Sequence, residues 1–270
     1  MLLTLDIGNT QINIGVWEGD VMRFSACLAT DRGRTGDQYA LEIKMMLESS
    51  GIFADKLRGS AISSVVPELT PMLTQAAGFF IEKQPIVLGP GVKTGLHIKV
   101  DNPAQVGADM VAAAVSAKER YPLPCLIADL GTATKLIVLD AKGAFCGCAI
   151  APGVGISLDA LSARASQLPA ISFANLGRSI GTNTVDSMRS GIVYGTAAML
   201  DGMTQRMENE LRFGYSNKSD AAVSEGFSSL VATGGLSENI VKHCVHNFRH
   251  EPDLVLDGLR RVYNRAQEDG

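Results

Sequence analysis

Short apolar runs separated by glycine-containing turns recur along this chain and predict β-strands. Residues 2–5 and 12–17 are mostly apolar, and the segment Asp6-Ile-Gly-Asn-Thr10 lies between them. Two apolar runs joined by a short turn that contains Gly and Asn are typical of a β-hairpin. Further buried strands are expected at residues 61–66 and 86–88.

Segments with apolar residues at helical spacing alternate with these strands. Residues 38–50 repeat apolar side chains at intervals of three and four, and a glycine follows them. Residues 67–80 predict a second helix, which Pro71 weakens, and residues 105–118 and 184–211 predict two more. Strands that alternate with helices in this way indicate an α/β fold.

The opening pattern of the chain recurs 123 residues later. Residues 125–128 are apolar and lead into Asp129-Leu-Gly-Thr-Ala-Thr134, and residues 136–139 are apolar again. A repeat of this length indicates two lobes of similar construction. Their boundary is expected near residues 121–124, where Tyr-Pro-Leu-Pro interrupts the preceding helix. The predicted lobes are residues 1–121 and residues 122–270.

The repeated turns carry chemistry that suits phosphates. A strand that ends in Asp and Gly, with Asn or Thr nearby, gathers backbone N–H groups and hydroxyls around a small concavity that accepts phosphate oxygens. The carboxylates of Asp6 and Asp129 can position a metal ion beside those phosphates. A third turn, Thr233-Gly-Gly-Leu236, precedes a helix expected from Ser237 and lets a flat base or ribose approach its backbone.

Ordinary turns between strands are the alternative explanation for each segment, because Asp, Asn and Gly are common turn residues. The internal repeat favours nucleotide-phosphate binding over that alternative. The chain contains neither GxxxxGK[ST] nor a correctly spaced GxGxxG. This argues against a Walker-type NTPase and against a Rossmann dehydrogenase. The polar residues 215–220 are expected to form an exposed loop.

Composition narrows the range of partners. The 270 residues include 24 Lys and Arg against 28 Asp and Glu, and 46% of them are hydrophobic. A net charge of −4 without a basic cluster argues against nucleic-acid binding and against a polybasic membrane anchor. No apolar run reaches membrane-spanning length, and the first residues do not resemble a signal peptide. Five scattered cysteines without zinc spacing fit reduced thiols in the cytoplasm.

Asp109 is the most informative single residue. It follows Gly107 near the expected start of a helix, where the helix dipole keeps a carboxylate ionised. A carboxylate beside a transferable phosphoryl group can accept the proton of an attacking hydroxyl. The alternative is an acidic residue that only stabilises the first turn of its helix.

Together these segments resemble the type III pantothenate kinases, a family of the acetate kinase, hexokinase, actin and Hsp70 fold superfamily. The resemblance extends over nearly the whole chain, and the order and spacing of the segments agree with it. The segments are Asp6-Ile-Gly-Asn-Thr10, Arg34-Thr-Gly-Asp-Gln-Tyr39, Gly89-Pro-Gly-Val-Lys-Thr-Gly95, Asp101-Asn-Pro103, Gly107-Ala-Asp109, Asp129-Leu-Gly-Thr-Ala-Thr134, Ala151-Pro-Gly153, Gly181-Thr-Asn-Thr184, Thr233-Gly-Gly-Leu236 and Leu256-Asp-Gly-Leu259.

The resemblance implies a fold and an activity. The fold would be two similar ribonuclease H-like lobes of the actin-like ATPase (ASKHA) type, with a nucleotide cleft between them. The activity would be ATP-dependent phosphorylation of pantothenate to 4'-phosphopantothenate, the first step of coenzyme A synthesis. The cofactors would be ATP, Mg²⁺ and a monovalent cation, K⁺ or NH₄⁺. A homodimer is implied as well, with the helix expected from Thr184 as a contributor to its interface.

The resemblance also implies roles for individual residues. Asp109 would be the proton acceptor, and Asp129 would bind the monovalent cation. Nucleotide phosphates and magnesium would lie against Asp6, Ile7, Gly8, Asn9, Thr10, Gln11, Ile12 and Asn13, with a phosphate contact from Thr132. The pantothenate pocket would include Val100, Gly107, Ala108, Asp109, Met110 and Thr184.

Two positions depart from the family pattern. Val100 and Met110 stand where the family usually has Tyr and Arg, and both positions belong to the implied substrate pocket. Loss of a charged hydrogen-bonding partner costs on the order of 1.5–3 kcal/mol, which would weaken pantothenate binding. Two alternatives therefore stay open: a kinase of the same fold with a changed acceptor, and a non-catalytic nucleotide-binding regulatory protein. The retained acids Asp6, Asp109 and Asp129 favour a catalyst.

Overall fold

The computed structural model describes residues 1–172, 177–213 and 226–268, so the loop expected at 215–220 lies outside the described residues. The chain divides into two compact units. The first unit contains Met1–Leu96, Asp101–Glu119 and Asp253–Gly270, and the second contains His97–Val100 and Arg120–Pro252. This division differs from the expected lobes at 1–121 and 122–270, because the C-terminal segment belongs to the first unit.

A five-stranded sheet forms the centre of the first unit, with strand order β3-β2-β1-β4-β5. The first three strands form an antiparallel meander, and β4 and β5 run parallel to β1. The predicted hairpin and the strands near residues 61–66 and 86–88 are confirmed. The edge strand β3 was not predicted, because its side chains alternate between exposed and half-buried rather than forming an apolar run. The bounds are β1 (Leu2–Ile7), β2 (Gln11–Glu18), β3 (Val21–Ala29), β4 (Gly59–Ser64) and β5 (Ile86–Val87).

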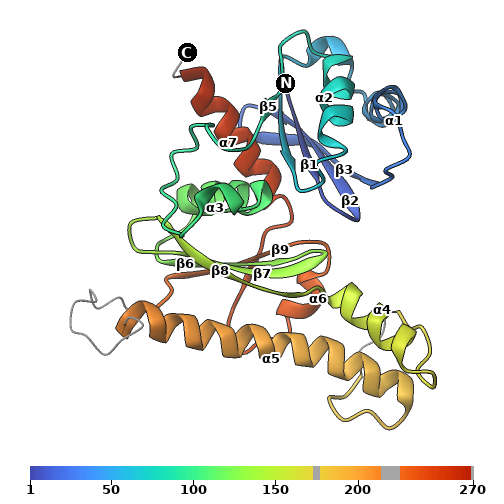
Figure 1. Cartoon of the computed structure of the whole chain (residues 1–270), viewed down its shortest axis with the longest axis vertical. Helices are drawn as coiled ribbons and strands as arrows, with labels where there is room; N and C mark the ends of the chain where they lie inside the picture. Colours follow the sequence, from blue (N-terminus) through green and yellow to red (C-terminus); the bar gives the residue numbers. More distant parts are fainter. Residues whose placement is uncertain (173–176, 214–225, 269–270) are drawn as a thin grey trace. The chain divides into compact units, whose positions relative to one another are not determined.

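Helices α1 (Gly36–Ser49) and α2 (Thr70–Gly78) cover one face of this sheet (Figure 1). Thr35 begins α1 with a capping box, in which its side chain accepts from the Gln38 N–H. The prediction that a helix starts at residue 67 and is weakened by Pro71 was wrong. The helix starts at Thr70, which places Pro71 in the first turn, where a missing N–H costs no hydrogen bond.

Helix α7 (Leu254–Glu268) packs on the opposite face of the first sheet. Leu256 of α7 contacts Leu2 and Trp17, whose side chains point away from the core beneath α1 and α2 because side chains alternate along a strand. Helix α3 (Ala108–Arg120) crosses α7 closely, since a Cβ at Gly258 would lie 1.9 Å from the carbonyl oxygen of Ala112. Helix α7 was not predicted from the sequence.

The second unit repeats the sheet of the first. Its strand order, β10-β9-β6-β7-β8, matches that of the first sheet when it is read from the other edge. Strands β6, β7 and β8 are antiparallel, and β9 and β10 run parallel to β6. Two lobes of similar construction are therefore confirmed. The bounds are β6 (Cys125–Leu130), β7 (Ala133–Leu139), β8 (Phe145–Pro152), β9 (Ser229–Thr233) and β10 (Arg249–His250).

Helix α5 (Thr184–Phe213) supplies most of the helical cover of the second sheet (Figure 1). Val193, Ala197 and Leu200 on its buried face pack against side chains of β6 and β7. The shorter helices α4 (Val154–Arg164) and α6 (Ser237–Val241) complete this unit. None of the helices in the described ranges is long and apolar enough to cross a membrane.

A buried ionic cluster joins α3 and α7 in the first unit. Asp257 is only 5% exposed and accepts hydrogen bonds from Ser116 at 2.6 Å, from Arg260 at 2.7 Å and from Arg261 at 2.7 Å. Arg260 also lies over the ring of Trp17 at 5.2 Å. Burial alone raises the pKa of Asp257, but the hydrogen bonds from Ser116, Arg261 and Arg260 outweigh it and hold the pKa below its usual value.

We expect Asp257→Asn to lower the free energy of unfolding of the first unit by about 1.5–3 kcal/mol at neutral pH. Arg260 and Arg261 each lose one of two carboxylate partners, and they keep Asp20 and Glu119 respectively. A depressed folded-state pKa stabilises the fold above the unfolded-state pKa of about 3.9, and this stability is lost as the pH falls below that value. The thermal midpoint should therefore depend less on pH below about 4 in the variant than in the parent. The exposed Asp55→Asn variant is the matched control. Equal effects of the two substitutions would contradict this assignment.

Candidate functional site

Asp6 lies near the end of β1, between residues of the two neighbouring strands. It pairs with Asn13 of β2 and with Ser63 of β4. The carboxylate is 8% exposed and accepts a hydrogen bond from Asn13 Nδ2 at 3.3 Å. The amide of Asn13 is neutral, so this hydrogen bond adds no positive charge beside Asp6.

The turn after β1 exposes Asn9, Thr10 and Gln11 to solvent. Gly8 donates its N–H to the Gln11 carbonyl at 2.9 Å and closes the turn. Thr30, just beyond the end of β3, supports it from outside by donating its hydroxyl to the Gly8 carbonyl at 2.7 Å. Exposed backbone and polar side chains at such a turn suit the binding of phosphate oxygens.

Several residues expected at the first turn have different surroundings. Ile7 and Ile12 are fully buried in the core of the first unit, so only their backbone groups are available to a ligand. Two residues that the sequence analysis missed, Thr30 and Arg32, contact the turn from the segment that contains β3. Arg32 donates to the Asn9 side chain at 3.1 Å and brings a positive charge to the turn. Because β3 itself was not predicted, the sequence contained no signal for this contact.

Asp129 lies near the end of β6 and occupies the same place in the second sheet. It pairs with Lys135 of β7 and with Thr233 of β9, as Asp6 pairs with Asn13 and Ser63 in the first sheet. Asp129 is 8% exposed, and its Oδ2 lies 2.7 Å from the ammonium nitrogen of Lys135. The sequence left open where Lys135 supplies its charge, and the structure places that charge beside Asp129.

Two glycines from neighbouring segments pack against the turn between β6 and β7, Gly131-Thr132, which is called the second turn below. A Cβ at Gly153 would lie 2.1 Å from the carbonyl oxygen of Thr132. A Cβ at Gly234 would lie 2.5 Å from the carbonyl carbon of Leu130, and Gly234 has a positive φ of 93°. The turn is therefore held by backbone packing on both sides, while the side chain of Thr132 stays exposed. The expected phosphate contact of Thr132 stays a prediction.

Asp109 lies in the first turn of α3 and is 8% exposed. The N–H of Met110 donates to its Oδ1 at 2.8 Å, which fixes the orientation of the carboxylate. Gly107 contacts the same oxygen closely, because a Cβ there would lie 2.5 Å from Oδ1. The expected helix start at residue 105 was wrong. Residues Pro103–Gln105 form a separate 3-10 turn, which leaves Asp109 at the start of α3.

The two departures from the family pattern fall in different units. Met110 belongs to the first unit and is 7% exposed, whereas Val100 belongs to the second unit and is half-buried. Neither side chain carries a charge or a strong hydrogen-bonding group. Each position therefore offers a ligand only apolar contact.

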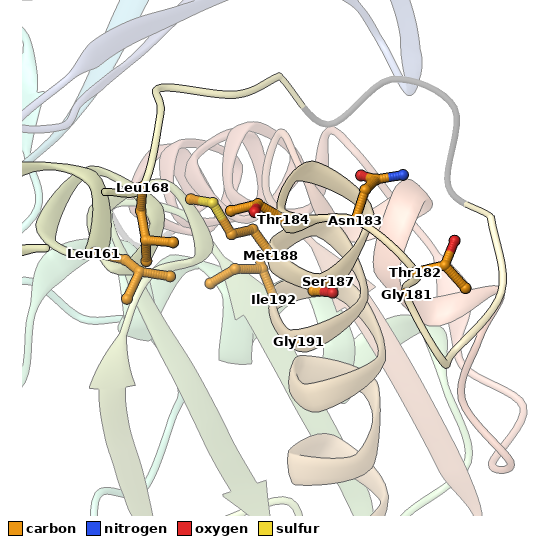
Figure 2. A pocket seen from close by; sticks show the side chains of 10 residues that line it. All are labelled: Leu161, Leu168, Gly181, Thr182, Asn183, Thr184, Ser187, Met188, Gly191 and Ile192. Atoms are coloured by element: carbon orange, nitrogen blue, oxygen red, sulfur yellow. The ribbon is translucent and has the colours of Figure 1, made fainter. Parts of the chain in front are cut away.

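Thr184 lines a pocket of about 580 Å³ in the second unit. Figure 2 shows the side chains of Leu161, Leu168, Met188 and Thr184 gathered on one side of this pocket. Asn183 caps α5, because its side-chain oxygen accepts the N–H of Asp186 at 2.9 Å. The pocket thus combines an apolar floor with hydroxyl and amide groups, a combination typical of sites for small organic ligands.

No group of three or more His, Cys, Asp or Glu side chains that could hold a metal ion occurs within 1–172, 177–213 and 226–268. Mg²⁺ usually binds through one or two carboxylates together with substrate phosphates and water. Asp6 beside an exposed turn fits that requirement, because the phosphates of a bound nucleotide would complete the coordination.

Comparison with known proteins agrees with these features. The family model described as type III pantothenate kinase matches residues 2–206. A type III pantothenate kinase of Moorella thermoacetica is 39% identical over 265 residues, which cover 98% of this chain and 99% of the relative. The likeness therefore includes both units.

Solved structures agree on the fold. A Campylobacter jejuni protein proposed to be a transcriptional activator of the Baf family has a TM-score of 0.60 and 16% identity, covering 98% of this chain and 99% of that one. The activator of 2-hydroxyisocaproyl-CoA dehydratase from Clostridium difficile, solved with bound ADPNP, has a TM-score of 0.56 and 13% identity, covering 100% and 97%. At these identities the likeness shows the fold alone, which is the expected actin-like ATPase type.

We expect Gly234→Ala to lower the free energy of unfolding of the second unit by about 1–3 kcal/mol, because Ala there adopts a left-handed backbone and its Cβ meets Leu130. The neighbouring variant Gly235→Ala is the matched control, since nothing lies within 4 Å of a Cβ at that position. Its effect should stay within about 0.5 kcal/mol. Denaturant unfolding of both variants measures the difference, and equal midpoints would show that the close approach to Leu130 contributes nothing.

Proposed function

The chain belongs to the type III pantothenate kinase family and is a kinase of pantothenate, and we propose that Asp109 accepts the proton during this reaction. The observation that supports this role is the orientation of the carboxylate at the start of α3, fixed by the Met110 N–H and by the close packing of Gly107. A carboxylate held in one orientation is suited to accept a proton from a positioned hydroxyl.

The proposed transfer conserves atoms and charge. The primary hydroxyl oxygen of pantothenate bonds to the γ-phosphorus of ATP, while the bond from that phosphorus to the bridging oxygen breaks and ADP leaves. The hydroxyl proton passes to the carboxylate of Asp109. Phosphoryl transfer needs mainly positioning and charge stabilisation from the protein, which fits a site built from turns and single acids.

The nucleotide side of the proposal rests on the first turn. Asp6 would hold Mg²⁺, which neutralises phosphate charge when it is bound. Exposed groups of Asn9, Thr10 and Gln11 would contact the phosphates, and Asn13 would orient the Asp6 carboxylate through its hydrogen bond of 3.3 Å. The exposed Thr132 of the second turn would add a phosphate contact.

The acceptor side of the proposal rests on two groups of residues. Gly107, Ala108, Asp109 and Met110 lie at the start of α3, and the pocket beside Thr184 offers apolar and hydroxyl groups that suit the methyl, amide and hydroxyl groups of pantothenate. We further propose a homodimer that works in the cytoplasm. The exposed apolar side chains of Ile156, Leu161 and Ile180 support an interface between two copies.

We expect pantothenate to stimulate ADP release from ATP and Mg²⁺ in a coupled assay. Because Val100 and Met110 offer no charged partner, the KM for pantothenate should be raised about tenfold or more over that of relatives with Tyr and Arg. The assay therefore extends into the high millimolar range. Nucleotide binding without any response to pantothenate would overturn pantothenate as the acceptor and leave a changed acceptor or a non-catalytic role.

We expect Asp109→Asn to lower kcat roughly 100-fold or more, the scale of general-base catalysis, while the Kd for ATP stays nearly unchanged. Gly107→Ala should lower kcat in the same direction, because its Cβ displaces the carboxylate oxygen. Gly78→Ala at the end of α2 is the control, since nothing lies within 4 Å of its Cβ. Unchanged turnover of the Asp109 variant would remove this residue from its proposed role.

A further inference from the structure

The two sheets place residues at three equivalent positions across their central strands. The residue that the hairpin partner places beside the central carboxylate differs in charge between the two sheets. In the first sheet the row is Asn13, Asp6 and Ser63, and in the second it is Lys135, Asp129 and Thr233. Lys135 is therefore the counterpart of Asn13. A neutral amide contacts Asp6, whereas an ammonium group contacts Asp129 at 2.7 Å.

The ion pair of Lys135 and Asp129 is shielded from water. The Lys135 side chain is 16% exposed and that of Asp129 is 11% exposed. Charges with so little exposure are screened weakly by solvent and salt, so they interact more strongly than a surface pair. The pair also lies at the mouth of the second turn, where Gly153 and Gly234 hold the backbone of residues 130–132 in place.

A monovalent cation at Asp129, which the resemblance implies, does not fit this arrangement. The ammonium nitrogen of Lys135 already lies at hydrogen-bond distance from Oδ2 of Asp129, one of the two oxygens through which this carboxylate would bind a cation. A second positive charge at the same carboxylate would be repelled by the first. An ammonium group carries the same single charge as K⁺ and is similar to it in size.

We propose that Lys135 takes the place of the monovalent cation, as an ammonium group tethered to β7, so that the reaction needs no added K⁺ or NH₄⁺. This inference rests on the proposed function for its catalytic consequence. The tethered charge lies beside the turn whose Thr132 is proposed to contact phosphate, where positive charge stabilises phosphate oxygens. The ammonium group is covalently attached to the chain, so no cation has to bind from solution.

The test compares monovalent salts at constant ionic strength. Pantothenate-dependent ADP release is measured for the unaltered chain and for Lys135→Met in choline, potassium and ammonium chloride. The unaltered chain should change less than about twofold between these salts, whereas Lys135→Met, which keeps the apolar stem, should lose about tenfold or more in choline. Potassium or ammonium should restore most of that loss, because a free cation then binds Asp129 in place of the missing ammonium group.

A matched lysine and a second readout complete the design. Lys142→Met removes an exposed lysine from the same hairpin and should behave as the unaltered chain in every salt. The thermal midpoint is titrated with KCl against choline chloride, because an ion that binds the folded state raises the midpoint with its concentration. Potassium should raise the midpoint of Lys135→Met but not that of the unaltered chain. Lys135→Ala serves as the second variant if Lys135→Met does not fold.

Three results would overturn the proposal: strong stimulation of the unaltered chain by potassium, full activity of Lys135→Met in choline, or a folded Lys135→Met that no cation restores. If pantothenate stimulates no turnover in any salt, the proposed function fails. The midpoint titration then still decides the cation site. Potassium that stabilises only the variant supports occupation of the site by Lys135, and potassium that stabilises the unaltered chain overturns it.

Discussion

The site depends on one constraint: the cross-strand register that sets a single residue beside the carboxylate at the end of each central strand. Asp6 and Asp129 both lie at the end of a strand whose side chains are buried on both faces, and each is only 8% exposed. A buried carboxylate needs donors or an opposite charge. The neighbouring strand supplies an amide from Asn13 in one sheet and an ammonium group from Lys135 in the other.

Close backbone packing fixes the positions of the second turn and of the Asp109 carboxylate. Because Gly153 and Gly234 have no side chain, their backbone packs closely against the second turn on both sides. Gly107 likewise packs its backbone against the carboxylate of Asp109. A methyl group at Gly107 would displace the carboxylate oxygen of Asp109, and a methyl group at Gly153 or Gly234 would displace the backbone of Thr132 or Leu130. The ionic cluster around Asp257 ties α7 to α3, the helix that starts at Asp109. The C-terminal helix thus stabilises the element that holds the proposed proton acceptor, although it lies far from it in the sequence.

The difference between the two sheets indicates that each sheet of the duplicated fold has its own role in binding the nucleotide. The first sheet keeps its carboxylate beside a neutral donor, which suits coordination of a divalent ion together with phosphates. The second sheet places a fixed positive charge beside its carboxylate, which suits direct attraction of phosphate. Val100 and Met110 alter only the residues assigned to the acceptor. The departures from the family pattern therefore concern the acceptor side, whereas the ammonium group beside Asp129 distinguishes the second sheet of this chain from the first.

The sequence by itself determined the duplicated α/β architecture, the family and the three acids, because apolar periodicity and the Asp and Gly turns are local patterns. Edge strand β3 was not predicted because it is half-polar. The membership of α7 in the first unit was not predicted because it depends on contacts across a long stretch of chain rather than on a local pattern. Only the tertiary structure decided the role of Lys135. A constant offset of 123 residues aligns Lys135 with buried Ile12, but the second turn, Gly131-Thr132, is one residue shorter than Gly8-Asn9-Thr10. Because side chains alternate along a strand, that one residue turns Lys135 toward Asp129.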